Sequence, residues 1–75
     1  MMRFDYSKLL GRIKECGYTQ ESLATEVGMA VSTMSLKLNN KAFFSQPEMK
    51  KICELLSISV DRIGEYFFAP EVQKN

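Results

Sequence analysis

Residues 19–41 read TQESLATEVGMAVSTMSLKLNNK, and this stretch decides the fold. On both sides of Gly28, apolar residues recur at intervals of three and four, which places them on one stripe of a helix. Gly28 itself can adopt the positive φ of a tight turn. Two helices joined by a three-residue turn that contains glycine form a helix-turn-helix. We therefore expect helices over about residues 20–27 and 31–38.

The same apolar spacing recurs before and after this stretch, and it predicts three further helices. Asp5 is expected to cap the first of these helices, and Gly17 to end it. The fourth and fifth helices of the chain are expected over about residues 46–56 and 60–68. Since no stretch alternates apolar and polar residues as a strand does, the pattern predicts an all-α fold of five short helices.

Capping residues mark where the later helices begin. Thr19 is expected to cap the second helix, and Ser45-x-x-Glu48 is a capping box at the start of the fourth. Ser59 is expected to cap the fifth helix. These polar residues can accept or return hydrogen bonds from the free N–H groups of a first turn, so they set the expected boundaries.

The composition limits the chemistry that the chain can perform. It has 75 residues, ten Lys and Arg against nine Asp and Glu, and no His. We interpret residues 1–70 as one domain, followed by a polar tail at residues 71–75. Without imidazole there is no His-based general base or metal ligand, and Cys16 and Cys53 form no C-x-x-C motif. We expect no enzyme activity, small-molecule substrate, cofactor or metal.

The sequence also carries expectations about location. No window approaches the run of about 18 apolar residues that a membrane-spanning helix needs. The N-terminal residues lack the apolar segment of a secretory signal. We therefore expect no membrane contact and a cytoplasmic protein.

The outer face of the helix expected at residues 31–38 is unusual. Its residues point away from Met34 and Leu38, and none is charged; they are Ser32, Thr33, Ser35, Leu36 and Asn39. An ordinary solvated helix face is rich in Glu and Lys, because Ser and Thr are poorer helix formers. Small hydroxyl groups suit a face that enters the major groove of DNA. The other interpretation is a solvated face that happens to be rich in Ser.

The motif T-Q-E-x-L-A-x-x-x-G-M followed by S-T-M-S resembles the helix-turn-helix of phage repressor and Cro proteins, the Cro/C1-type (Xre-like) family. The ending S-L-K-L-N-N-K-A-F-F further resembles short repressor-like proteins from phages of Gram-positive bacteria. The resemblance implies a compact five-helix domain similar to that of lambda repressor. It also implies a sequence-specific regulator of transcription that binds double-stranded DNA, with residues 31–38 in the major groove.

The resemblance can be carried to single residues of this chain. It implies that three residues read bases: Val31, Ser32 and Leu36. It implies that four residues meet phosphates: Gln20, Asn39, Asn40 and Lys41. From their own positions, Ser35 is a further candidate for reading bases, and Thr33 and Lys37 are further candidates for phosphate contacts. The family usually has a capping Ser or Thr where Ala30 stands, so this helix is expected to begin one residue late, capped by Ser32.

Members of that family usually bind as twofold dimers, so the resemblance also implies a homodimer on an operator. Three apolar residues are candidates for the dimer interface: Phe44, Val60 and Phe68. The alternative is that they only cover the edge of the core of a small domain.

A second function stays open beside DNA binding. The net charge is only +1, with an excess of +2 in residues 1–41 and of −1 in residues 42–75. Phosphate contacts by Lys and Arg supply most of the affinity of ordinary DNA-binding proteins, so this balance is low for one. The alternative is a protein-interaction module, such as an antitoxin or the partner of another repressor.

Overall fold

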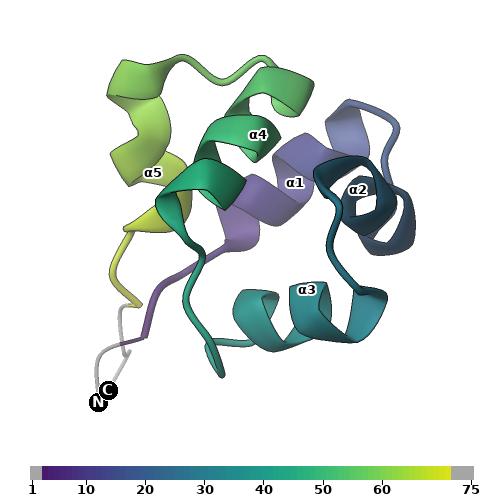
Figure 1. Ribbon diagram of the computed structural model, residues 1–75. Helices are drawn as coiled ribbons and strands as arrows, with labels where there is room; N and C mark the ends of the chain where they lie inside the picture. Colours follow the sequence, from purple (N-terminus) through teal and green to yellow (C-terminus); the bar gives the residue numbers. More distant parts are fainter. Residues whose placement is uncertain (1–2, 72–75) are drawn as a thin grey trace.

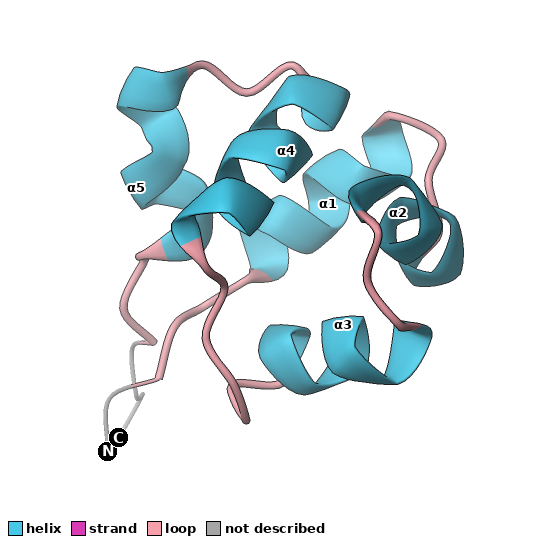
Figure 2. Cartoon of the chain, in the orientation of Figure 1, coloured by secondary structure: helices cyan, strands magenta, loops and turns pink. Residues whose placement is uncertain are grey.

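The computed structural model describes residues 3–71 and contains five α-helices and one 3₁₀ turn in that range (Figure 1). The elements are α1 (Ser7–Glu15), α2 (Gln20–Val27), α3 (Val31–Leu38), α4 (Gln46–Leu56), η1 (Val60–Arg62) and α5 (Ile63–Phe67). Figure 2 shows helices and loops only over these residues. The all-α class and the five helices predicted from the apolar spacing are therefore confirmed. Of the tail expected at residues 71–75, residues 72–75 lie outside the described part.

The expected capping residues explain why α2 and α4 begin where they do. The Ser22 N–H donates to Thr19 Oγ1 (3.0 Å), and the Thr19 N–H donates to Ser22 Oγ (2.9 Å). At α4, the Glu48 N–H donates to Ser45 Oγ (3.3 Å), and the Ser45 N–H donates to Glu48 Oε1 (2.8 Å). Each pair satisfies two backbone donors that a helix start leaves free. Gly28 ends α2 with φ of 85°, a left-handed conformation that favours glycine.

The start of α3 corrects one expectation. The helix begins at Val31, and Ser32 lies inside its first turn rather than capping it. Ala30 has no side-chain acceptor, but its extended backbone (φ −65°, ψ 146°) lets its carbonyl accept from the Met34 N–H (3.0 Å). The helix therefore begins at Val31 without a side-chain cap.

The start of the last helix corrects a second expectation. The segment opens with the 3₁₀ turn η1, and α5 begins only at Ile63. Ser59 makes no side-chain capping bond to the backbone. Its hydroxyl donates to Asp61 Oδ1 (2.6 Å). A 3₁₀ turn winds more tightly than an α-helix, so the apolar stripe is displaced. Val60, at the start of this segment, is 76% exposed.

The core lies where α4 packs against α2 and α5, with α1 behind it (Figure 1). Its largest fully buried side chains come from all five helices: Leu9, Leu23, Met34, Ile52, Leu56 and Phe67. Their burial follows from the three- and four-residue spacing, which gives each helix one apolar stripe. No helix in residues 3–71 is long and apolar enough to cross a membrane.

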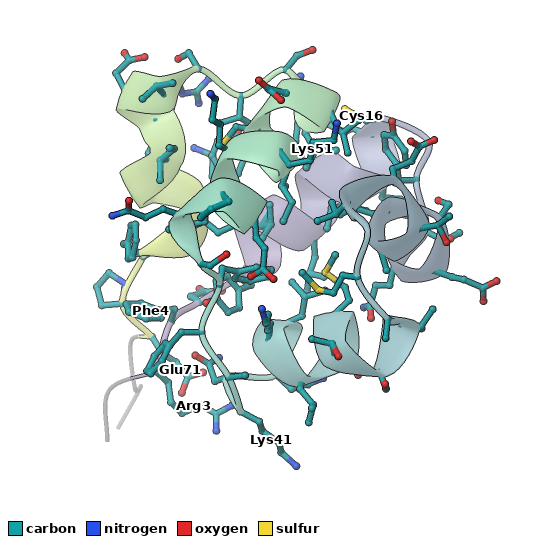
Figure 3. All side chains as sticks on the ribbon, in the orientation of Figure 1. Arg3, Phe4, Cys16, Lys41, Lys51 and Glu71 are labelled. Carbon is teal, nitrogen blue, oxygen red and sulfur yellow. The ribbon has the colours of Figure 1, made fainter. Side chains whose placement is uncertain are left out.

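The two ends of the described chain run side by side (Figure 3). Phe4 and Pro70 form an isolated antiparallel bridge, flanked by the Asp5 N–H donating to the Ala69 carbonyl (2.7 Å). The Glu71 N–H donates to the Arg3 carbonyl (3.1 Å), and their side chains form an ion pair at 3.4 Å. These contacts join the first and last segments that the structure describes.

Candidate functional site

The outer face of α3 presents the side chains that the sequence singled out. Val31 is 45% exposed and Leu36 is 46% exposed, while Ser32 lies between them and is also exposed. Ser35 and Thr33 are half-buried. Met34 and Leu38 point into the core, as expected. The face is therefore convex, uncharged and only moderately apolar.

Three of the residues expected to meet phosphates already have partners inside the chain. Lys37 is largely buried and forms an ion pair with Glu48 of α4. Asn39 Nδ2 donates to the Ser35 carbonyl (2.7 Å). Lys37 therefore holds α3 against α4, whereas Asn39 bonds back onto the last turn of α3 itself.

Asn40 makes the most specific of these internal contacts. Its Oδ1 accepts from the Phe4 N–H (2.8 Å), and its Nδ2 donates to the Phe4 carbonyl (3.0 Å). Its backbone has a φ of 63°, which Asn tolerates better than most residues. Asn40 thus joins the end of α3 to the N-terminal segment, while Gln20 and Lys41 remain exposed.

The residues expected at a dimer interface lie in two different places. Phe44 is half-buried in an aromatic cluster, with ring centroids 5.7 Å from Tyr6 and 5.3 Å from Phe67 in edge-to-face geometry. It therefore covers the edge of the core, which was the alternative interpretation. Val60 and Phe68 instead line one apolar groove.

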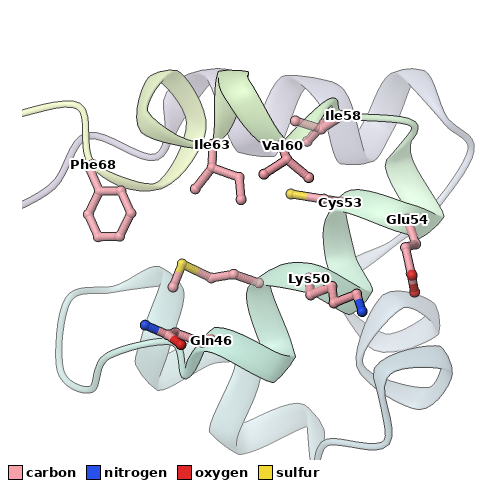
Figure 4. Close-up of a pocket in the computed structure, with 9 residues that line it drawn as sticks. Gln46, Lys50, Cys53, Glu54, Ile58, Val60, Ile63 and Phe68 are labelled. Carbon is pink, nitrogen blue, oxygen red and sulfur yellow. The ribbon is translucent and has the colours of Figure 1, made fainter.

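This groove lies between α4 and the segment that contains η1 and α5 (Figure 4). It encloses about 650 Å³ and opens to solvent. One wall comes from α4 and the other from residues after it; its apolar lining is Met49, Cys53, Ile58, Val60, Ile63 and Phe68. Burial raises the pKa of the Cys53 thiol, so the neutral thiol faces the groove. We name this feature the α4–α5 groove.

The sequence did not predict the α4–α5 groove as one site, although Val60 and Phe68 of its lining were candidates for a dimer interface. Met49 and Cys53 lie on the predicted stripe of the fourth helix, and Val60 and Ile63 on that of the fifth. Two facing stripes are ordinarily packed together. The 3₁₀ turn leaves them apart at the surface, and only the surplus of apolar residues around Val60 was a signal in the sequence.

Charges are distributed unequally on the two walls of the groove. Lys50 and Glu54 of α4 line it, together with Gln46, whereas the lining of the opposite wall is uncharged (Figure 4). The charges of α5 are used on the side that faces α1. There, Arg62 and Lys8 both pair with Glu65 and lie over the ring of Tyr66.

The Glu65 cluster is held by hydrogen bonds to a carboxylate. Arg62 Nε lies 3.0 Å from Glu65 Oε2, and the Lys8 ammonium contacts Oε1. Hydrogen bonds from Arg62 and then from Lys8 lower the pKa of Glu65 to about 2. The carboxylate therefore stays charged, and these cations are occupied away from the groove.

Comparison with known proteins places the chain in a family. The chain belongs to the family described as "Protein of unknown function (DUF739)", which it matches over residues 2–70. The matching family is thus not the Cro/C1-type family that the motif resembles. No curated protein sequence matches the chain significantly.

A solved structure is similar over almost the whole chain. It is the solution structure of the modulator of repression (MOR) of the temperate bacteriophage TP901-1 from Lactococcus lactis. The two chains are 38% identical with a TM-score of 0.77, over 93% of this chain and 95% of the other. The chain is therefore similar to a small phage regulator in both sequence and fold.

This likeness corrects the functional interpretation of the helix-turn-helix. The expected regulator that binds double-stranded operator DNA as a homodimer is wrong, because the likeness points to a protein partner rather than DNA. The similar protein is a modulator of repression, which favours the alternative of a partner of a repressor. The contact roles expected for single residues depended on DNA as the partner, and this likeness does not test them one by one. The motif was misleading because a helix-turn-helix is a packing unit that serves more than one function.

Proposed function

We propose that this chain modulates repression in a temperate phage by binding the repressor protein in the cytoplasm of the bacterial host. The observation that carries this proposal is the 38% identity to a modulator of repression over nearly the full length of both chains. The proposal includes no catalytic step.

The polar chemistry of the surface supports a protein partner over DNA. Lys37 and Asn40, which a DNA-binding role would require at phosphates, are engaged by Glu48 and by the Phe4 backbone. The net charge of +1 provides little counterion release, on which affinity for DNA depends. Exposed apolar groups on α3 and at the α4–α5 groove instead suit a protein surface.

Titration calorimetry with the repressor encoded in the same phage genome tests this function. We expect saturable binding, with a Kd of about 1 μM or tighter if the contact is specific. In gel-shift assays on the repressor's operator, the chain alone is expected not to retard the DNA. Added to the repressor, it is expected to change the fraction of operator bound.

The variant Lys41→Ala is a control, because it removes a charge that the DNA-binding interpretation assigned to a phosphate contact. Lys41 is exposed at the end of α3, and its side chain points away from the neighbouring segments (Figure 3). This substitution is expected to change the Kd for the repressor by less than about twofold, as for a surface charge outside the interface. Saturable retardation of the operator by the chain alone, or no complex with the repressor, would show that the proposed function is wrong.

A further inference from the structure

The α4–α5 groove exposes apolar side chains that a bound partner could bury. Val60 is 76% exposed and Phe68 is 50% exposed, and they rim the same concave surface. Between them lie Met49 and Ile63, which are only half-buried. Exposed apolar groups that gather at a concave surface mark binding sites more often than single exposed groups do.

The charges on the α4 wall restrict what can occupy the groove. Lys50 and Glu54 are four residues apart, so they lie on one face of α4, one turn apart. Neither forms an ion pair with another of residues 3–71. A Lys that precedes a Glu by four residues pairs less well than the reverse order, which leaves both charges available.

From these features we propose that the α4–α5 groove is the docking site for an amphipathic helix of the repressor. The proposal rests on the proposed function and names the site and the kind of segment that it binds. The apolar stripe of the helix enters between Val60 and Phe68. Flanking the stripe, an acidic and a basic residue one turn apart meet Lys50 and Glu54.

The shape of the groove favours a helix over an extended peptide. The described residues around it offer no long strand edge, which an added strand would need for its hydrogen bonds. A helix satisfies its own backbone and presents apolar side chains every three or four residues. The volume of about 650 Å³ accommodates several such side chains.

The first experiment compares Val60→Asp with Val31→Asp in titrations of the full-length repressor. Both substitutions place a carboxylate at an exposed Val, one in the groove and one on the outer face of α3. We expect Val60→Asp to weaken binding about tenfold or more, as at the centre of an interface. Val31→Asp is expected to change it by less than about threefold. Circular dichroism should show unchanged unfolding midpoints, since both side chains are exposed.

The second experiment compares Lys50→Glu with Lys51→Glu. The two residues are neighbours on α4 and both are exposed, but only Lys50 lines the groove. Lys50→Glu is expected to weaken repressor binding about fivefold, and Lys51→Glu by less than about twofold. Glu54→Lys should weaken binding to a similar extent as Lys50→Glu.

Several results would overturn the inference. Equal losses for Val60→Asp and Val31→Asp, or a loss only for Val31→Asp, would place the contact elsewhere. Self-association in sedimentation equilibrium that Val60→Asp abolishes would make a second copy the occupant. Both results leave the proposed function intact. No binding of the repressor by the unchanged chain would instead overturn the proposed function and this inference together.

Discussion

The outer face of α3 and the α4–α5 groove both expose apolar side chains, but they differ in shape and in how their polar groups are used. The α3 face is convex, and polar residues near it bond within the chain, as Asn40 does with Phe4. The groove is concave, and the two charges on its rim, Lys50 and Glu54, have no partner among the described residues. Polar groups that already bond within the chain stabilise the fold, whereas polar groups without such a partner are available for binding. We therefore propose the groove as the main binding surface and the helix-turn-helix chiefly as its scaffold.

The largest expected effect distinguishes the interior of this scaffold from its outer face. Leu23 of α2 is fully buried, whereas Leu36 of α3 is 46% exposed. Leu23→Ala is expected to reduce the free energy of unfolding by about 2–5 kcal/mol, because it leaves a cavity. Leu36→Ala is expected to cost less than about 1 kcal/mol, because a surface truncation leaves no cavity. Urea denaturation followed by circular dichroism measures both, and equal costs would contradict the assignment of α3's outer face.

An intermediate effect is expected at the contact between the end of α3 and the N-terminal segment. Asn40→Ala removes two hydrogen bonds to Phe4. It also places alanine, which has a Cβ but no polar side chain, at a φ of 63°. We expect a loss of about 1–3 kcal/mol in the free energy of unfolding. Asn40→Gly should lose less, since glycine tolerates positive φ.

Asn39→Ala is the control for this contact. Asn39 is exposed and bonds only within α3, so its replacement is expected to stay within about 0.5 kcal/mol. If Asn39→Ala and Asn40→Ala destabilise the chain equally, Asn40 does not act as a structural clamp.

The smallest expected effect concerns the charges of α5 that face α1. The pKa of Glu65 is lowered from 4.5 to about 2, so the folded chain binds this proton less readily than the unfolded chain. The stabilisation from Glu65 is therefore present above pH 4.5 and is lost as the pH falls towards about 2. Unfolding midpoints across this range should fall less steeply for Glu65→Gln than for the unchanged chain.

Salt provides the control for that measurement. The Glu65 cluster is exposed, so about 1 M salt should reduce the difference between the two pH profiles. Parallel profiles at low salt would contradict the pairing of Glu65 with Arg62 and Lys8. They would also remove the reason why no α5 charge takes part in the groove.

Much of the fold was predictable because its signals are local. The capping residues Thr19 and Ser45 act within three residues of themselves, and Gly28 acts on its own φ. The bounds expected for α2 and α4 are confirmed for this reason. The delayed start of α5 was not predictable from periodicity, because Ser59 bonds to Asp61 and the segment opens as a 3₁₀ turn.

The functional interpretation was less predictable than the fold. The T-Q-E-x-L-A motif reports how α2 and α3 pack, and that packing is present. It contains no information on whether Lys37 faces a phosphate or Glu48, because those two residues meet only after α3 and α4 are assembled. The motif determines packing, so it correctly predicted the fold. It led to a wrong prediction of the binding partner.

By itself, the sequence determined the class of fold, the approximate positions of α2, α3 and α4, and most of the buried residues on the first four helices. Those properties depend on interactions between residues a few positions apart, which a linear chain specifies directly. Only the tertiary structure decided which polar residues bond within the chain and which apolar residues remain exposed to solvent. Val60 and Phe68 form one groove with Met49, 11 positions before Val60 in the sequence, because α5 folds back beside α4. Such distant contacts depend on how whole helices pack, and periodicity within one helix cannot specify them.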